Sequence, residues 1–560
     1  MTTTEHTSSP SALDPLTSGN TPNLEKIDRE TAAARKRDDR ANRLKPYSHW
    51  SLGAPAPPPS YKDVTSYIHT RLTDRERSFL ATDVTDLYQR LAVKECTVVE
   101  VTTAFCKATY AAQELTNCVT EVMFTQALAQ TGKVVGPLHG VPVSIKDHIC
   151  VKGEDTATGF VAWAGRTVAG EDAAIVKILR AAGAVIYSLF AFETFTNIYG
   201  CTTNPHNRNL TRGGSSGGEG ALIASRASLL GIGIDVGGSV VICSHLHGLH
   251  RGPSAWCGLY GLKPSSHRLP ASGLMRPCEG MENIVGDLGP MTHSARDLEL
   301  FFRVVSNYKP WNADFKEGNE KLVIGFFTDD GVVAPHPPII QQLQKTREAL
   351  IAAGYGVIDW TPMDHMGAFE LAVKLYMLDG GENIRAILAE SGEPAIPQVA
   401  SVLPDVKRGG GCTLAQSWAI NTRRDQFRAK TLKHWNNTAL RSKSGRPVDV
   451  ILCPAAPTLA APHGETRWIG YTSYWNILDL SAIAFASGKP FDASNWEPTI
   501  SSASSEPRNP VDEFLRAQWN PETFDGGPIG LQLVGRRWRE EKLLAALKQV
   551  EDAVAQFEKS

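Results

Sequence analysis

The chain of 560 residues lacks the features that direct proteins to membranes or to nucleic acids. Lysine plus arginine (57) nearly balances aspartate plus glutamate (59), so the net charge is −2 and no basic face is indicated. No stretch contains the roughly 18 uninterrupted apolar residues that a membrane-spanning helix requires. We therefore expect a cytoplasmic protein with no nucleic-acid or membrane partner, which acts on a small molecule.

Signals for disulfides and for cofactors are also missing. The ten cysteines are dispersed without a C-x-x-C pair, and we expect no secretory leader, so free thiols in a reducing compartment are predicted. No Gly-Lys-Ser/Thr closes a glycine run, which excludes a phosphate-binding P-loop. His245, His247 and His250 cluster, but no acidic or cysteine partner completes a zinc spacing. We predict neither a metal nor another cofactor.

Composition divides the chain into three parts. Residues 1–28 are rich in Ser, Thr, Pro and Asn without apolar periodicity, which predicts a disordered tail. Residues 29–59 combine a charged segment, expected to be a solvated helical arm, with a proline-rich connector. Residues 60–557 alternate helical patterns with short apolar runs, and we expect them to form one large domain.

This alternation of helices and strands favours a parallel or mixed sheet. The strand candidates are residues 183–187, 257–264, 322–327, 355–358, 448–454 and 530–535. The helix candidates are residues 83–112 as two helices, then 172–182, 338–353, 414–440 and 540–557.

The chemistry is expected at a segment rich in glycine and serine, Gly213–Gly220, followed later by Gly237-Gly238-Ser239. Glycine lets successive backbone N–H groups converge on one anionic atom, and serine supplies a nucleophile or a proton shuttle. Ala221–Ile232 predicts a short buried helix that runs into a strand, which would return the second serine to the first. A flexible linker is the alternative, but the embedded Glu219 and the flanking apolar runs favour a packed loop.

The same segment satisfies the pattern G-x-S-x-G, the nucleophile elbow of α/β-hydrolases. That motif needs a hydrophobic strand directly before it, whereas residues 204–212 are typical of a loop. We interpret the match as accidental.

A lysine ends a short apolar run at Pro142–Lys146, just before Asp147. One interpretation is that Lys146 reaches the surface or pairs with Asp147. The other is a desolvated lysine that acts as a base, because burial lowers the pKa of a lysine.

With Lys146, Ser215 and Ser239 in view, the chain resembles the amidase signature family, whose members hydrolyse amides with a Ser–Ser–Lys triad. The resemblance covers about residues 60–555, and Leu138-His139-Gly140 and Ser391–Pro397 are similar to the fungal acetamidase-type branch. The motifs that carry it are Gly140–Asp147, Gly213–Ala221, Asp235–Ser239, Tyr260–Ser265 and Gly527–Gly535.

The resemblance implies an α/β fold with a single mixed β-sheet core surrounded by helices, an amidase signature catalytic domain over 60–557, and no cofactor. It implies Ser239 as the nucleophile, Ser215 as the bridging serine after a cis peptide from Gly214, and Lys146 as the base. The backbone N–H groups that would hold the oxyanion belong to Val236, Gly237, Gly238 and Ser239. An acyl-enzyme would form and be hydrolysed, releasing a carboxylic acid and ammonia or an amine.

Three departures from the family pattern lie close to these residues. Ile234 and Val241 stand where the family usually has a threonine and an arginine. Residues Val241–His250 look inserted, and without them Ser239-Val240-Arg251 reads as an ordinary family sequence. We therefore expect the arginine partner of Asp235 to be displaced. The chain also looks shortened near Ala129–Thr131 and Ser188–Thr194.

The resemblance leaves several functions open. An amide hydrolase of small or medium aliphatic or aryl amides comes first, with pocket loops that include Tyr376, Trp475 and Asn476. The alternatives are a catalytically impaired amidase-like protein that retains its pocket and a pathway-specific amidase of secondary metabolism. An ammonia-supplying amidotransferase subunit is disfavoured by the acetamidase-type motifs and by the absence of a basic docking face. The sequence does not indicate an oligomeric state.

Overall fold

The computed structural model describes most of the chain. The described residues are 28–53, 57–58, 60–130, 135–190, 195–237, 250–306, 321–400, 403–404, 410–497 and 506–560. The predicted tail lies outside them except for Asp28, and so do Gly238, Ser239, Val240 and residues 241–249 of the expected insertion. Residues 131–134 and 191–194, beside the two expected shortenings, also lie outside.

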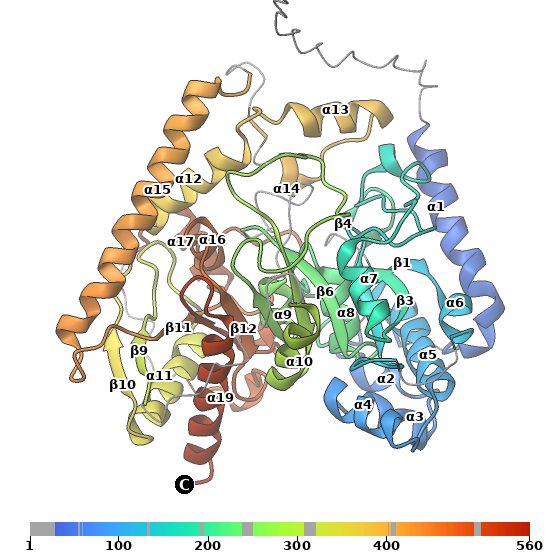
Figure 1. Cartoon of the computed structure of the whole chain (residues 1–560), viewed down its shortest axis with the longest axis horizontal. Helices are drawn as coiled ribbons and strands as arrows, with labels where there is room; N and C mark the ends of the chain where they lie inside the picture. Colours follow the sequence, from blue (N-terminus) through green and yellow to red (C-terminus); the bar gives the residue numbers. More distant parts are fainter. Residues whose placement is uncertain are drawn as a thin grey trace, which may run out of the picture.

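A mixed sheet of eleven strands crosses the described part of the molecule (Figure 1). β2 is parallel to β3 and β6, and β9 is parallel to β10 and β11, whereas the remaining neighbours are antiparallel. This confirms the predicted α/β fold with a single mixed sheet. In spatial order the strands are β1 (Val119–Val122), β3 (Val185–Phe190), β2 (Pro142–Lys146), β6 (Leu230–Asp235), β8 (Asp287–Thr292), β7 (Tyr260–Lys263), β12 (Ala482–Ala486), β13 (Gly530–Val534), β11 (Val450–Pro454), β9 (Val323–Phe326) and β10 (Gly356–Asp359). A separate pair joins β4 (Phe195–Thr196) to β5 (Gly200–Cys201).

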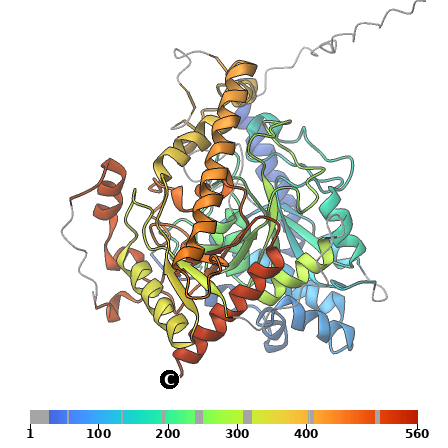
Figure 2. The ribbon, with the colours of Figure 1, turned by 60° about the vertical axis from the view of Figure 1, so that its left-hand side comes forward.

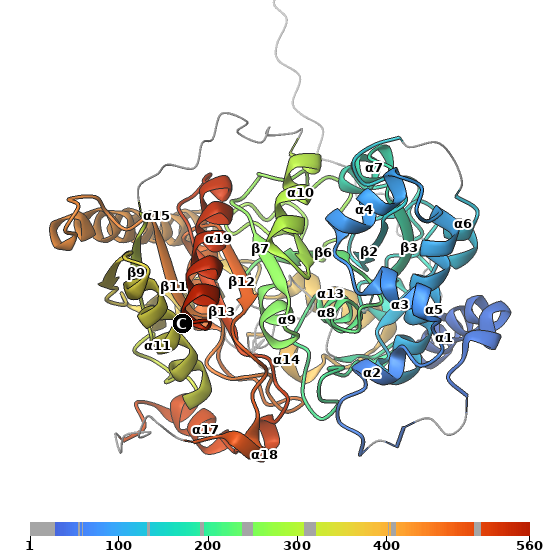
Figure 3. The same cartoon turned by 90° about the horizontal axis from the view of Figure 1, so that it is seen from below.

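Helices surround the sheet. Seen from below, α19, α10 and α4 lie in front of the strands (Figure 3), and a turned view brings the long helix α15 forward (Figure 2). The helices are α1 (Arg29–Leu44), α2 (Thr65–Ile68), α3 (Asp74–Leu80), α4 (Val84–Ala92), α5 (Val98–Thr116), α6 (Phe124–Leu128), α7 (Ala174–Ala181), α8 (Gly217–Ala224), α9 (Arg251–Trp256), α10 (Ala295–Val305), α11 (Pro337–Ala352), α12 (His365–Tyr376), α13 (Glu382–Ser391), α14 (Pro397–Ala400), α15 (Leu414–Asn437), α16 (Gly470–Ile477), α17 (Pro510–Gln518), α18 (Pro521–Phe524) and α19 (Glu540–Phe557). No helix among the described residues is long and apolar enough to cross a membrane.

The predicted elements form where local signals are strong. Thr97 caps α5 in a reciprocal pair with Glu100, and Thr413 does the same for α15 with Gln416. β2, β3, β6 and β11 are buried along their whole length, which is why they read as continuous apolar runs rather than alternating patterns.

Helix α1 differs from the solvated arm that its charges predict. It packs against β1, and Lys36 on its inner face is 6% exposed. The Lys36 amine lies 2.9 Å from Asp155 and also binds Glu121, so its charge is paired inside the protein. The helix is therefore docked on the sheet through buried ion pairs.

Candidate active site

Lys146 ends the buried strand β2 and is itself fully buried. Its amine donates a hydrogen bond to the hydroxyl of Ser215. The interpretation in which Lys146 reaches the surface is therefore wrong, because the side chain turns inward to a serine from a loop 69 residues away.

Ser215 lies in the tight loop that precedes α8. The Gly214–Ser215 peptide is cis, as the resemblance implied, and Gly213 has a φ of +82°. A Cβ atom on Gly213 would lie 2.9 Å from the backbone nitrogen of Pro253, so this position requires glycine. The next residue, Ser216, accepts a 3.2 Å hydrogen bond from the N–H of Ile234 and so fastens the loop to the end of β6.

The carboxyl ends of two parallel strands bring the parts of the site together. β2 pairs in parallel with β6, with Ile145 opposite Ile232, so both strands end at the same edge of the sheet. Lys146 is the last residue of β2, and Asp235 is the last residue of β6. We call Asp235-Val236-Gly237 the oxyanion strand end, after the role that the resemblance implies for its N–H groups. Val236 and Gly237 lie here, whereas the predicted nucleophile Ser239 and Gly238 lie outside the described residues.

The aspartate of the oxyanion strand end has an arginine partner in spite of the insertion. Nε of Arg251 donates to Oδ2 of Asp235 at 2.9 Å, and a terminal nitrogen donates to Oδ1 at 3.2 Å. Our expectation that the insertion displaces this arginine is therefore wrong, because α9 begins at Arg251 and returns its side chain to the site. Gln532 accepts from the same guanidinium at 3.1 Å, and Asn476 donates to Asp235 at 2.7 Å.

Burial and ion pairing have opposite effects on the pKa of Asp235. Burial alone would raise the pKa of its carboxyl, but the charge and the hydrogen bonds of Arg251 hold the pKa below the usual value. Asp235 is thus a carboxylate fixed in place, which anchors the start of the oxyanion strand end.

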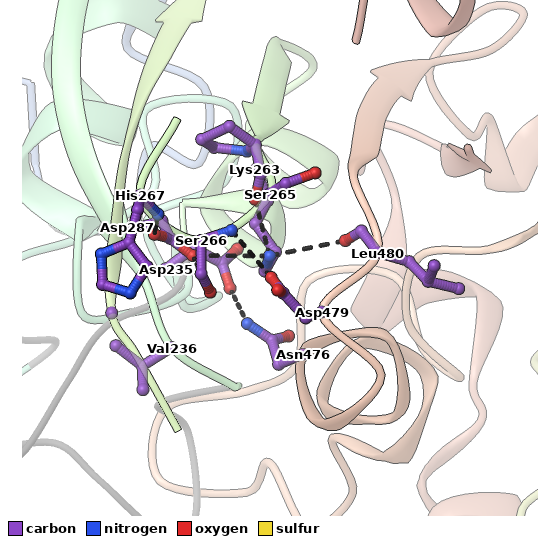
Figure 4. Close-up of polar contacts among 12 residues, drawn as sticks. Asp235, Val236, Lys263, Ser265, Ser266, His267, Asp287, Asn476, Asp479 and Leu480 are labelled. Carbon is purple, nitrogen blue, oxygen red and sulfur yellow. Dashed lines mark hydrogen bonds and ion pairs between the residues drawn. The ribbon is translucent and has the colours of Figure 1, made fainter. Parts of the chain in front are cut away.

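A further polar network lies beside this anchor (Figure 4). The Lys263 amine is 3.6 Å from Asp287 and donates to the carbonyl of Leu480 at 3.4 Å. Ser266 donates its N–H to Asp479 at 2.7 Å and its hydroxyl to Asp287 at 3.2 Å. Burial raises the pKa of Asp287 to about 7, against the opposing charge of Lys263. The network ties the end of β7 to the start of β8 and to the turn after α16.

Tyr376, expected in a pocket loop, instead holds the oxyanion strand end. Its hydroxyl, on the last residue of α12, donates to the carbonyl of Val236 at 2.7 Å. A Cβ atom on Gly237 would lie 1.5 Å from that hydroxyl oxygen, so only glycine fits beneath the tyrosine. Because C=O and N–H point in opposite directions in a trans peptide, this bond turns the N–H of Gly237 away from Tyr376.

His250, the last residue of the expected insertion, is buried above the sheet. Cβ atoms on Gly233 and Gly289, which face each other across β6 and β8, would lie 2.7 Å and 2.4 Å from its side chain. Nδ1 lies 3.8 Å from Asp235, and burial lowers the pKa of the imidazole to about 4. The sequence indicated His250 only as one of three clustered histidines, although glycines inside a strand signal the close approach of another group.

Glu219, on α8 behind Ser215, is a fully buried carboxyl. Ser144 on β2 donates to it at 2.5 Å. Burial raises its pKa to about 8, although Ser144 and the charge of Lys146 act in the opposite direction. Glu219 therefore packs the glycine-serine segment against β2, as its apolar flanks indicated.

Known proteins match the chain over most of its length. The family model described as Amidase matches residues 100–544. The acetamidase of Emericella nidulans is 35% identical over 517 residues, covering 86% of this chain and 90% of that protein. The acetamidase of Aspergillus oryzae is 34% identical over 514 residues, covering 86% and 91%.

Solved structures agree with these relatives. A fatty acid amide hydrolase superposes with a TM-score of 0.83 at 28% identity, covering 95% of this chain and 98% of that one. A bacterial aryl acylamidase superposes with a TM-score of 0.64 at 19% identity, which shows the shared fold. The chain belongs to the amidase signature family, is similar to the acetamidases of fungi, and is a hydrolase that acts on amides.

Proposed function

We propose that this protein cleaves linear carboxylic amides through a Ser239–Ser215–Lys146 triad and an acyl-enzyme. The observation that carries the proposal is the buried hydrogen bond from the Lys146 amine to Ser215, at the edge of the sheet where β6 leads toward Ser239. A serine hydroxyl is a weak nucleophile, and it needs a proton acceptor within hydrogen-bond reach.

The proposed reaction runs in two halves. Neutral Lys146 accepts a proton from Ser215, which accepts one from Ser239 as the Ser239 oxygen bonds to the amide carbon. Backbone N–H groups of Val236, Gly237, Gly238 and Ser239 stabilise the oxyanion, at about 3 kcal/mol for each effective donor. The proton returns through Ser215 to the leaving nitrogen, and ammonia or an amine departs. Water then attacks the ester and releases the carboxylate.

The hydrogen bonds that hold the oxyanion strand end in place support the proposed role of its backbone N–H groups. Arg251 and Asn476 hold Asp235, and Tyr376 holds the Val236 carbonyl, so the backbone that leads to the nucleophile is fixed before substrate binds. Such preorganisation is what makes an oxyanion hole effective. Because two of the relatives are acetamidases, we expect this protein to act on small aliphatic amides, and we include aryl amides as members of the same chemical class.

Ammonia release from a panel of simple aliphatic and aryl amides tests the proposal. We expect turnover by the full chain that rises from acidic to alkaline pH, because the lysine must be neutral to accept a proton. Ser239→Ala abolishes it, and Lys146→Ala lowers it by about 10³-fold or more, as loss of a triad member does elsewhere. A rate that peaks near pH 5, or turnover that survives Ser239→Ala, contradicts the triad.

A fluorophosphonate probe separates an active hydrolase from an impaired protein that retains its pocket. Labelling of Ser239 in the full chain supports the hydrolase, because the probe reacts with activated serines. A variant without Val241–His250 puts Val240 directly before Arg251 and serves as the comparison. Labelling and turnover only in this shorter variant would show that the insertion disables the site.

A further inference from the structure

A cysteine and a histidine meet on the surface outside the triad. Cys201 ends β5 and is exposed, and His463 lies half-buried in the loop between β11 and α16. The Sγ atom of Cys201 lies 3.6 Å from Nδ1 of His463. This is hydrogen-bond distance for a thiol and an imidazole.

A third group fixes the orientation of the imidazole. Nε2 of His463 lies 3.0 Å from the carbonyl oxygen of Arg208. A carbonyl can only accept, so Nε2 carries the hydrogen and donates it. In the neutral ring Nδ1 is then the acceptor, and it faces the sulfur of Cys201. A nucleophile, a base and an orienting group in this order form the arrangement that activates thiols.

The surrounding charges favour transfer of the proton to the ring. Desolvation would raise the pKa of the Cys201 thiol, but the hydrogen bond with His463 and the charges of Arg212 and His463 lower it overall. The same contact raises the pKa of His463 against the effect of burial. Arg212, in the adjoining loop, donates at 2.8 Å to the carbonyl of Thr202, and the same carbonyl accepts a 3.3 Å hydrogen bond from the Cys201 thiol.

We propose that Cys201 and His463 form an activated thiolate–imidazolium pair, which makes Cys201 a site of oxidation by hydrogen peroxide. The proton moves from Sγ of Cys201 to Nδ1 of His463. The thiolate attacks one peroxide oxygen, so that an S–O bond forms and the O–O bond breaks. The sulfur gives up two electrons and becomes a sulfenic acid, while the departing hydroxide takes the proton from His463 and becomes water.

The test compares Cys201 with Cys412, the other exposed cysteine among the described residues, in the same molecule. Full-length protein is treated with limiting iodoacetamide at several pH values, and the modified peptides are quantified by mass spectrometry. We expect Cys201 to react about ten-fold faster than Cys412 at pH 6.5, because the thiolate is the nucleophile. After brief peroxide treatment, dimedone should trap a sulfenic acid at Cys201 and leave Cys412 unlabelled.

The variant His463→Gln removes the base and keeps an amide that can bind the Arg208 carbonyl. We expect it to bring the alkylation rate of Cys201 down to that of Cys412 and to abolish the dimedone adduct. The rate at Cys412, which is exposed, is the internal reference, and circular dichroism shows whether the variant remains folded. Equal rates at the two cysteines in the natural chain, or a Cys201 rate that His463→Gln leaves unchanged, would overturn the proposal.

Discussion

Single hydrogen bonds fix the backbone around the proposed triad, and Tyr376 provides the clearest example. Tyr376→Phe deletes the donor to Val236 and keeps the ring that fills the space above Gly237. The Val236–Gly237 peptide then loses its fixed orientation, and we expect kcat to fall by about 10-fold to 100-fold, less than the loss of an oxyanion donor. KM should stay nearly constant, because the interaction matters most in the transition state.

The matched control is Tyr187→Phe, which deletes another buried tyrosine hydroxyl bound to a carbonyl, that of Ala227, at 2.5 Å. Both variants should lose similar thermal stability, but only Tyr376→Phe should lose kcat. A loss expressed wholly in KM, or an equal loss in both variants, would show that Tyr376 has no positioning role.

A buried carboxyl sets a pH dependence of stability. The pKa of Glu219 is raised from 4.5 to about 8 in the folded protein, so between these values the folded state binds a proton that the unfolded state has released. The contribution of Glu219 to the free energy of unfolding is therefore complete below pH 4.5, decreases between pH 4.5 and 8, and is lost as the pH rises through 8. Chemical denaturation at pH 5, 6.5 and 8 should show the natural chain losing more than ~1 kcal/mol relative to Glu219→Gln. A constant difference between the two proteins would contradict the raised pKa.

At the scale of elements, paired glycines allow α9 to begin against the sheet. β6 and β8 place Gly233 opposite Gly289, and His250 fills the space above them. A Cβ atom on Gly289 would lie 2.2 Å from the carbonyl of Leu262 and 2.4 Å from the imidazole. We expect Gly289→Ala to lower the free energy of unfolding by about 1–3 kcal/mol, the usual cost of overpacking a core.

Gly170→Ala is the control, because nothing lies within 4 Å of an added Cβ there. Urea denaturation of the two variants measures the difference. A Gly289→Ala protein as stable as the control would mean that His250 does not occupy this space. Removal of His250 together with Gly289→Ala should recover part of the loss, because the two side chains compete for one volume.

At the scale of the whole molecule, buried ion pairs dock α1 on the sheet. Lys36→Met removes the cation that Asp155 and Glu121 share and leaves only Arg43, 3.8 Å from Glu121, beside these two buried carboxyls. We expect a loss of about 3–5 kcal/mol in the free energy of unfolding, because an uncompensated buried charge remains. Arg35→Met, at the exposed neighbour, should stay within about 0.5 kcal/mol of the natural chain. A small effect of Lys36→Met would mean that α1 is a weakly held arm.

The amino-acid sequence by itself determined the family and those elements whose local signals are strong. Lys146 and Ser215 could be found from local signals, because the residues of each motif are adjacent in the chain. The glycines around them mark positions where the backbone adopts conformations that other residues rarely adopt. Strands such as β11 and helices such as α5 were predicted because propensity and capping act over a few residues. β8 and β12 were missed, because interior glycine, proline and alanine hide a strand whose pairing comes from distant segments.

Only the tertiary structure decided which distant groups meet. Arg251 reaches Asp235 across an insertion, and Tyr376 reaches Val236 from a helix 140 residues away. Lys36 is buried although its helix reads as solvated, since pairing with Glu121 and Asp155 offsets the cost of desolvation. No local pattern encodes these contacts, because each depends on the path of the chain between the two residues. The amino-acid sequence determines which chemical groups are available at each position. The packing of the sheet and helices determines which of these groups come into contact.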